Sequence, residues 1–334
     1  MEIKVNVDTD FFKVNDNFKK QENVKSIFIY KANNYDSSEI TFVIPTFKRV
    51  DTLQQTLKSI LTQKGDYNYT IIVLDNNPER NDVTELYMKD LNVSCISYVK
   101  NCENLGMAGN WNRGIVLSRS KWICLLHDDD VIVPEFLREM LPYTKKYHDA
   151  AILQSRKYRT ASPEIQEEKV YDGKMIKISD LDFYQYHILD VPSGILYNRD
   201  IVIQEGGFDS DFYPSLDYCF HTKIASKYPV YLLNKPLTWY REGTQNASKL
   251  VDTQIGWLIV DYYLVLQLLN NHHIPKFIIR PYLEFKTEKR AASDQQLWGQ
   301  SFDIPYEELN WHGYSKASKK IANKVLSILI KFSK

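Results

Sequence analysis

Short apolar runs alternate with amphipathic segments through the first half of the chain. The runs cover residues 41–44, 70–74, 94–99 and 121–126, and we predict a strand at each. After the first run, apolar residues recur at Leu53, Leu57, Ile60 and Leu61, the spacing of a helix that buries one face.

A signal for the start of the first helix and three further helical segments complete this pattern. Asp51, followed three residues later by Gln54, is expected to begin the first helix by accepting free amide hydrogens. We predict further helices over residues 83–91, 108–117 and 134–147. Strands that alternate with helices predict an α/β fold with a doubly wound, mainly parallel sheet.

The flanking parts of the chain follow other patterns. Residues 1–38 are polar apart from one apolar patch, and we expect a leader or an edge strand there. From about Gly256 the pattern is helical, so we predict a helical C-terminal region over 246–334. The domain between them is expected to span 39–245, with an internal division near residue 150.

A segment that contains acidic, amide or small residues follows each predicted strand of the first half. These segments occupy residues 45–47, 75–77, 101–112 and 127–130. Ligands of open α/β sheets bind outside the carboxyl ends of the strands. Acidic, amide and small residues are therefore expected to converge on one edge of the sheet.

The acidic run after the fourth strand is a candidate metal site. Adjacent carboxylates repel one another, and a divalent cation such as Mg²⁺ or Mn²⁺ removes the cost of burying them. The D-x-D spacing of Asp128 and Asp130 lets both side chains face one ion. The alternative is a solvated acidic loop that caps the next helix.

Other segments carry candidate chemistry with structural alternatives beside it. Asp75 can accept hydrogen bonds from a base or a ribose, or form an Asx turn before Pro78. The segment 104–114 fits neither a dinucleotide-binding nor a P-loop pattern, but its amides can line a polar pocket. Carboxylates follow a glycine pair over 206–217 and include candidate general bases. Residues 239–241 offer a stacking surface and a cation, or ordinary core packing with a surface arginine.

Charge and cysteine content exclude several classes of protein. The chain has 42 basic and 42 acidic residues, so it lacks the overall positive charge of a nucleic-acid-binding protein. Its four cysteines contain no C-x-x-C pair, which argues against a disulfide scaffold or a zinc site. The N-terminus lacks a secretion signal, and residues 257–269 are too short to span a bilayer, so a cytoplasmic setting is expected.

Six segments stand in an order that resembles the family 2 glycosyltransferases, whose fold is called GT-A. They are VIPTFKR (43–49), LDNNP (74–78), NLGMAGNWNRG (104–114), LLHDDD (125–130), GGFD (206–209) and the later Asp217. The resemblance implies an inverting transfer of one sugar from a nucleotide-diphosphate sugar, UDP-linked by expectation, to a hydroxyl of a glycan or a lipid-linked acceptor. By the same analogy the acceptor belongs to a bacterial surface polysaccharide.

The resemblance also implies roles for individual residues. Asp130, with Asp128 as a second candidate, would hold Mn²⁺ or Mg²⁺, and Asp217, with Asp211 in reserve, would be the catalytic base. His127 replaces a frequent acid of the family, and no effect on the metal is expected. The nucleotide-sugar side would comprise Pro45, Thr46, Phe47, Arg49, Asp75, Asn76, Asn104, Gly106, Asn110, Asp128 and Asp129. The acceptor or phosphate side would comprise Ser193, Gly194, Trp239 and Arg241.

Two other functions are weighed against this one. A sugar nucleotidyltransferase also uses metal-bound carboxylates on an α/β sheet, but it opens with a glycine-rich basic loop, unlike residues 45–48. A non-catalytic carbohydrate-binding relative would be expected to lose its D-x-D acids, which are present here.

The last 19 residues predict an amphipathic basic helix. Ile321, Val325, Ile328 and Phe332 share one side, and residues 316–334 contain six lysines and no acid. Such a helix either contacts the inner face of the cell membrane or docks on its own protein.

Overall fold

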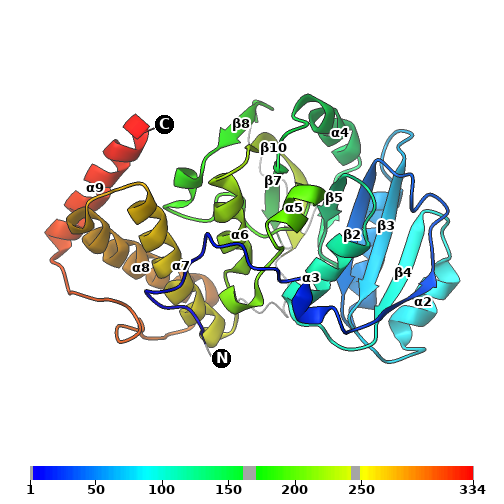
Figure 1. Cartoon of the computed structure of the whole chain (residues 1–334), viewed down its shortest axis with the longest axis horizontal. Helices are drawn as coiled ribbons and strands as arrows, with labels where there is room; N and C mark the ends of the chain where they lie inside the picture. The colour runs from blue at the N-terminus through cyan, green and yellow to red at the C-terminus, as the bar shows by residue number, and fades with distance from the viewer. Residues whose placement is uncertain (1–2, 161–170, 242–248, 334) are drawn as a thin grey trace.

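The computed structural model describes residues 3–160, 171–241 and 249–333. A mixed sheet runs through this part of the chain (Figure 1). Its strand order is β1 (Ser26–Tyr30), β4 (Ile96–Asn101), β3 (Tyr69–Asp75), β2 (Ile40–Thr46), β5 (Trp122–Leu125), β9 (Ile195–Asn198), β7 (Ile152–Thr160), β10 (Val230–Arg241) and β6 (Val131–Ile132), and β8 (Met175–Ile178) also pairs with β10.

The first half of the sheet is the predicted parallel, doubly wound unit. β4, β3, β2 and β5 pair in parallel. The helices that connect or follow these strands are α1 (Val50–Leu61), α2 (Val83–Leu91), α3 (Gly106–Leu117) and α4 (Phe136–Lys146). All residues of β2, β4 and β5 are buried, as expected of parallel strands covered on both faces. The predicted α/β fold is confirmed.

The start of α1 differs from expectation, and the N-terminal apolar patch is an edge strand. α1 begins at Val50 after Arg49, and Asp51 lies inside its first turn instead of capping it. There the Asp51 carboxylate can still interact favourably with the helix dipole. Residues 26–30 form an edge strand, antiparallel to β4.

The second half of the sheet mixes both pairings. β9 is antiparallel to β5 and β7, whereas β10 is parallel to β7. The associated helices are α5 (Arg199–Gln204) and α6 (Leu216–Ala225), and short 3-10 helices span Lys19–Gln21, Asp180–Phe183 and Ser210–Phe212. The long twelve-residue β10 joins this half to the acidic loop, because it pairs with β6 just after that loop.

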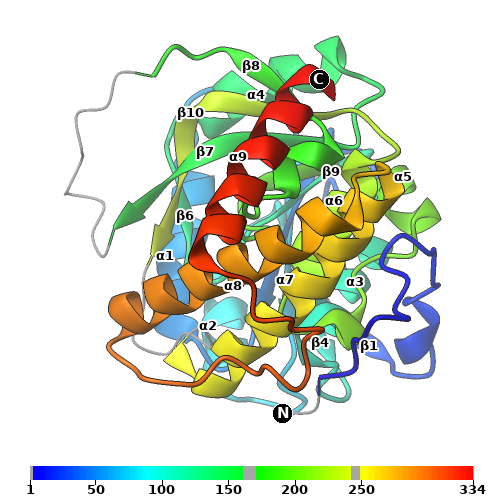
Figure 2. The ribbon, with the colours of Figure 1, turned by 90° about the vertical axis from the view of Figure 1, so that its left-hand side faces the viewer.

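Three helices form the predicted C-terminal helical part: α7 (Val251–Asn271), α8 (Lys276–Trp298) and α9 (Lys316–Ser333). Figure 2 shows them stacked on one end of the molecule, with α9 outermost. Most of their buried apolar residues share one core cluster with residues of the sheet and of α6. The predicted boundary near residue 246 lies outside the described residues. In the described chain, every helix is too short or too polar for a membrane span.

Candidate active site

A cavity of about 730 Å³ opens at the carboxyl ends of the parallel strands. Its wall contains residues from strand ends, from α3 and from helices α6 to α8. Among the predicted site residues, it contains Pro45, Thr46, Phe47, Arg49, Asn76, Asn104, Gly106, Asn110, Asp128, Asp129 and Asp217. Residues far apart in the sequence therefore share one hollow, although their individual roles remain predictions.

Asp128 is tied to the end of β2. Its Oδ2 accepts a hydrogen bond from Thr46 Oγ1 at 2.7 Å, and Arg49 Nη1 lies 3.5 Å from its Oδ1. The same Arg49 nitrogen donates to Asp129 Oδ2 at 2.8 Å. Burial raises the pKa of Asp128 to about 6. Through these bonds Asp128 links β2 to the acidic loop. Asp128, the second predicted metal ligand, is not part of the candidate metal cluster.

His127, Asp129 and Asp130 form a candidate metal cluster. One ligand atom from each residue lies within 4.8 Å of the others. Asp130 is fully buried; its Oδ1 accepts from the backbone N–H of Arg241 at 3.0 Å, and its Oδ2 has no hydrogen-bond partner among the described residues. A buried oxygen without a partner costs free energy, and a cation removes that cost. The donor set therefore fits a divalent metal.

Protonation of the cluster supports the same interpretation. Burial, and then the charge of Asp129, raise the pKa of Asp130 to about 7. Burial lowers the pKa of His127 to about 4, so its imidazole is neutral at pH 7 and able to bind a metal. The His127 ring stacks on Trp111, with 5.4 Å between the centroids. Sequence reasoning missed His127 as a candidate ligand, although its position next to the D-x-D pair was an available signal.

Asparagine side chains hold the loops on the other side of the cavity. Asn76 Nδ2 donates to Asn104 Oδ1 at 2.7 Å, and its Oδ1 accepts from Asn101 Nδ2 at 3.0 Å. Asn101 also donates to Asn110 Oδ1 at 2.9 Å. Gly106 begins α3 with φ at +67°, a conformation that favours glycine. These amides fix the start of α3 against the end of β3.

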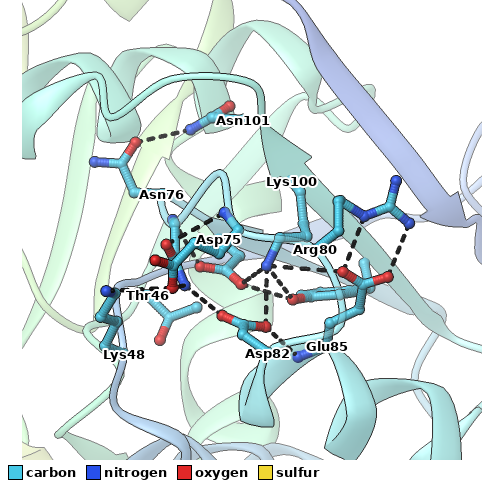
Figure 3. A network of polar contacts seen from close by, with 12 residues as sticks. Thr46, Lys48, Asp75, Asn76, Arg80, Asp82, Glu85, Lys100 and Asn101 are labelled. Atoms are coloured by element: carbon cyan, nitrogen blue, oxygen red, sulfur yellow. Dashed lines mark hydrogen bonds and ion pairs between the residues drawn. The ribbon is translucent and has the colours of Figure 1, made fainter.

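Asp75 lies behind the cavity wall and is fully buried. Its Oδ1 accepts from the backbone N–H of Asn77, and its Oδ2 accepts from Tyr98 Oη at 2.6 Å and Lys100 Nζ at 2.8 Å. Lys100 also reaches Asp82 at 3.1 Å, so a buried cation sits among carboxylates (Figure 3). Asp75 thus forms both the Asx turn and an ion pair, and direct contact with a nucleobase remains a prediction.

The two candidate bases occupy different surroundings. Asp217 lies in the first turn of α6, lines the cavity and has a side chain that is 16% exposed. Burial raises its pKa to about 7. Asp211 is not on the cavity wall and forms ion pairs with Lys4 at 2.7 Å and Lys20 at 3.0 Å. Of the two, only Asp217 lies where a ligand in the cavity could reach it.

A chain of three rings, of which His221 and Tyr197 are buried, backs Asp217. His187 Nδ1 lies 4.0 Å from Asp217 Oδ2, and His187 Nε2 lies 2.7 Å from His221 Nδ1. The Tyr197 hydroxyl is 2.7 Å from His221 Nε2. Burial keeps the pKa of both histidines well below the usual value. When Tyr197 donates, His221 donates to His187, and the remaining N–H of His187 points its positive end at Asp217.

The structure brings none of the four predicted acceptor-side residues to the cavity wall. Ser193 is buried, and its Oγ accepts from the backbone N–H of His127 at 3.0 Å. Gly194 packs so closely on Thr238 that a Cβ would lie 2.3 Å from its Oγ1. Trp239 stacks on Tyr158 with 4.0 Å between centroids, which is the core-packing alternative.

Strand alternation explains the position of Trp239. Neighbouring residues of β10 point to opposite faces, so Tyr240 lines the cavity while Trp239 does not. Arg241 supports the acidic loop from behind, since its Nε donates to the carbonyl of Asp129 and its Nη1 to Gln55. A contact of Arg241 with a phosphate stays a prediction.

Comparison with known sequences agrees with the motifs. Residues 41–206 match the sequence model described as Glycosyl transferase family 2. An uncharacterized glycosyltransferase of Haemophilus influenzae is 24% identical over 230 residues, which cover 67% of this chain and 75% of that protein. The succinoglycan biosynthesis protein ExoO of Rhizobium meliloti is 29% identical over 103 residues, covering 31% of this chain and 29% of ExoO.

Solved structures share the fold. Residues 1–349 of S. aureus TarS, in complex with UDP-GlcNAc, give a TM-score of 0.54 at 12% identity, covering 89% of this chain and 92% of that one. The mannosyltransferase PcManGT of Pyrobaculum calidifontis, in complex with GDP-Man and Mn²⁺, gives 0.52 at 14% identity, covering 92% and 89%.

Proposed function

Because this chain belongs to glycosyl transferase family 2, we propose that its cavity transfers one sugar, with inversion, from a nucleotide-diphosphate sugar to an acceptor hydroxyl. The observation that carries the proposal is one hollow shared by Asp129, Asp217 and the amides of the strand ends. The partial similarity to ExoO favours an acceptor in polysaccharide biosynthesis, either a glycan or a lipid-linked sugar.

The donor would lie along the parallel strands. Phe47 is 44% exposed on the cavity wall and offers a ring for a nucleobase, while Asn76 and Asn104 offer amides. A UDP-sugar is the expected donor, which the UDP-GlcNAc complex of TarS supports and the GDP-mannose complex of PcManGT leaves open to test.

Mn²⁺ suits the cluster of His127, Asp129 and Asp130 better than Mg²⁺. Mg²⁺ prefers oxygen ligands alone, whereas the cluster also offers an imidazole nitrogen. When bound, the metal would neutralise the charge that develops on the departing diphosphate.

The protein's own groups would handle the acceptor. Asp217 would accept the proton of the acceptor hydroxyl. The hydroxyl oxygen would attack the anomeric carbon from the face opposite the leaving diphosphate. Arg49, which holds Asp128 and Asp129, would keep the acidic loop in place during this displacement.

A thermal-shift panel tests the donor and the metal together. Nucleotides and nucleotide sugars of uridine and guanosine are each added with and without Mn²⁺. We expect stabilisation by one base only, and a larger one with Mn²⁺. Because Asp130 offers the buried unpartnered oxygen, Asp130→Asn should weaken Mn²⁺ binding by about 10–100-fold or more, since even loss of an indirect metal contact costs that much.

Asp66→Asn is the matched control, because Asp66 is exposed before the start of β3, at the opposite edge of the sheet. Its metal response should equal that of the wild type. Stabilisation without any metal response, or an unchanged response in Asp130→Asn, would contradict the metal assignment. No stabilisation by any nucleotide would contradict the function, and would favour the non-catalytic alternative over a sugar nucleotidyltransferase.

We further propose that α9 contacts an anionic membrane surface. Its inner face packs on the protein through Ala322, Leu326 and Ile330, so the helix does dock on its own chain. Its outer face nevertheless exposes Ile321, Ile328 and Phe332, the last to 88%. Lysines 316, 320, 324 and 331 flank this stripe, a combination that favours negatively charged lipid.

Replacing Ile321, Ile328 and Phe332 by serine is expected to weaken binding to vesicles of anionic lipid by about tenfold or more, because apolar area no longer enters the lipid. Co-sedimentation with vesicles measures the effect. A double serine variant of Val83 and Leu86, which are exposed on α2, serves as control and should bind like the wild type. Equal binding of both variants, or none by the wild type, would contradict the proposal.

A further inference from the structure

The cavity has a second wall that lies outside the family match. Besides the strand ends, α7 contributes Trp257 and Asp261, and α8 contributes Arg290 and Asp294. These residues follow position 206, where the match ends. Figure 1 shows α7 and α8 beside α6, on the side of the molecule away from the parallel strands.

An aromatic side chain is held in place on this wall. Trp257 is half-buried, and its Nε1 lies 3.4 Å from the carbonyl oxygen of Pro214, to which it donates. The guanidinium of Arg290 lies over the Trp257 ring, 5.2 Å from its centroid. A fixed indole that lines a polar cavity offers an apolar surface for the C–H groups of a sugar ring.

The charged groups around the indole form a connected set. Arg290 donates to Asp294 at 2.7 Å and lies 3.5 Å from Asp261. Asp261 also accepts from Ser215 Oγ at 2.7 Å. Burial leads the causes that raise the pKa of Asp294 above its usual value. The set offers carboxylate oxygens and guanidinium N–H groups, which suit the alternating donors and acceptors of sugar hydroxyls.

The balance of charge on this wall argues against an anionic ligand. Three carboxylates, Asp217, Asp261 and Asp294, line it together with Arg290. Elsewhere on the cavity wall, Arg159 is paired with Asp190, with 3.0 Å between Nε and Oδ2. Lys286 adds a second cation nearby, with its Nζ 5.7 Å from the ring centroid of the cavity-lining Tyr218. The three carboxylates still outnumber the two cations, so a phosphate or a uronic acid would meet net negative charge, whereas a neutral sugar would not.

The second wall is also coupled to the candidate base. Ser215, which Asp261 fixes, is the residue immediately before α6, and Asp217 lies in the first turn of that helix. The same residue, Asp261, would therefore contact a ligand bound at Trp257 and hold the start of the helix that carries Asp217. Asp217 is the proposed acceptor of the proton from the ligand's hydroxyl.

We propose that α7 and α8 form the acceptor subsite and that it takes a neutral sugar, with its ring against Trp257 and its hydroxyls on Asp261, Arg290 and Asp294. This assignment rests on the proposed glycosyl transfer and names its acceptor class. It replaces Ser193, Gly194 and Trp239 as the acceptor side of the cavity.

Binding of the full chain to an immobilised glycan library tests the proposal. The library contains neutral oligosaccharides, uronic-acid oligosaccharides and glycerol-phosphate-bearing glycans, and UDP and Mn²⁺ are present throughout. We expect binding to neutral glycans, and a loss of about tenfold or more for Trp257→Ala and for Asp294→Asn. Phe277→Ala, which removes an exposed aromatic ring of α8 outside the cavity, should bind like the wild type.

Thermal stabilisation by nucleotide, measured on each variant, reports folding and the donor side independently. Preference for the acidic or phosphate-bearing glycans, absence of glycan binding by the wild type, or full binding by both cavity variants would overturn the subsite. If no nucleotide stabilises the wild type, the proposed function is overturned instead.

Discussion

Replacing Asp217 with asparagine is expected to lower kcat by about two to four orders of magnitude while nucleotide binding persists. Asparagine has nearly the same shape but cannot accept a proton from the acceptor hydroxyl. Asp217 lies on the cavity wall beside the acceptor subsite, whereas the nucleotide contacts are expected at the strand ends. Release of nucleoside diphosphate measures turnover, and thermal shift measures donor binding.

The pH dependence provides a second readout of the same group. Burial raises the pKa of Asp217 to about 7, and a base must be ionised to act. We therefore expect kcat/KM of the wild type to rise with pH up to about 7 and to level off above it. The residual activity of Asp217→Asn should lack this rise.

Asp211→Asn separates the two carboxylates that follow the glycine pair. Asp211 is 43% exposed and paired with Lys4 and Lys20, away from the cavity. This variant should keep the turnover and the pH profile of the wild type. A large loss in Asp211→Asn combined with normal turnover in Asp217→Asn would reverse the assignment of the base.

The strand-end argument explains how much of the site could be predicted. Buried parallel strands have a strong apolar signal, and the polar residues after them must meet at one edge; Thr46, Asn76 and Asp129 do line one cavity. The prediction for β10 was limited because side chains of a strand alternate between its two faces. Nothing in the sequence says whether Trp239 or Tyr240 faces the cavity. The sheet register supplies that answer.

For other parts of the site, no pattern in the neighbouring sequence predicts a role. Trp257 and Arg290 stand 33 positions apart on different helices, and only the packing of α7 and α8 against α6 brings them together beside Asp217. Lys100 looked like an ordinary polar residue at a strand end. Its position among buried carboxylates depends on β3, β4 and α2 meeting in space.

Replacing Lys100 with methionine is expected to lower the free energy of unfolding by about 3–5 kcal/mol. The Lys100 side chain is only 2% exposed and lies 2.8 Å from Asp75, 3.1 Å from Asp82 and 3.9 Å from Glu85 (Figure 3). Methionine fills a similar volume but leaves the Asp75 carboxylate buried without a counter-ion. Denaturant unfolding followed by circular dichroism measures the loss.

Lys89→Met is the matched control for this prediction. Lys89 pairs with the same Glu85 at 2.8 Å, but its side chain is 42% exposed, so its removal should cost about 1 kcal/mol or less. Adding Asp75→Asn to Lys100→Met removes the stranded charge and should restore part of the lost stability, since Tyr98 can still donate to the side-chain oxygen of the new amide. Equal losses in the two lysine variants would mean that the buried ion pair contributes no more than a surface one.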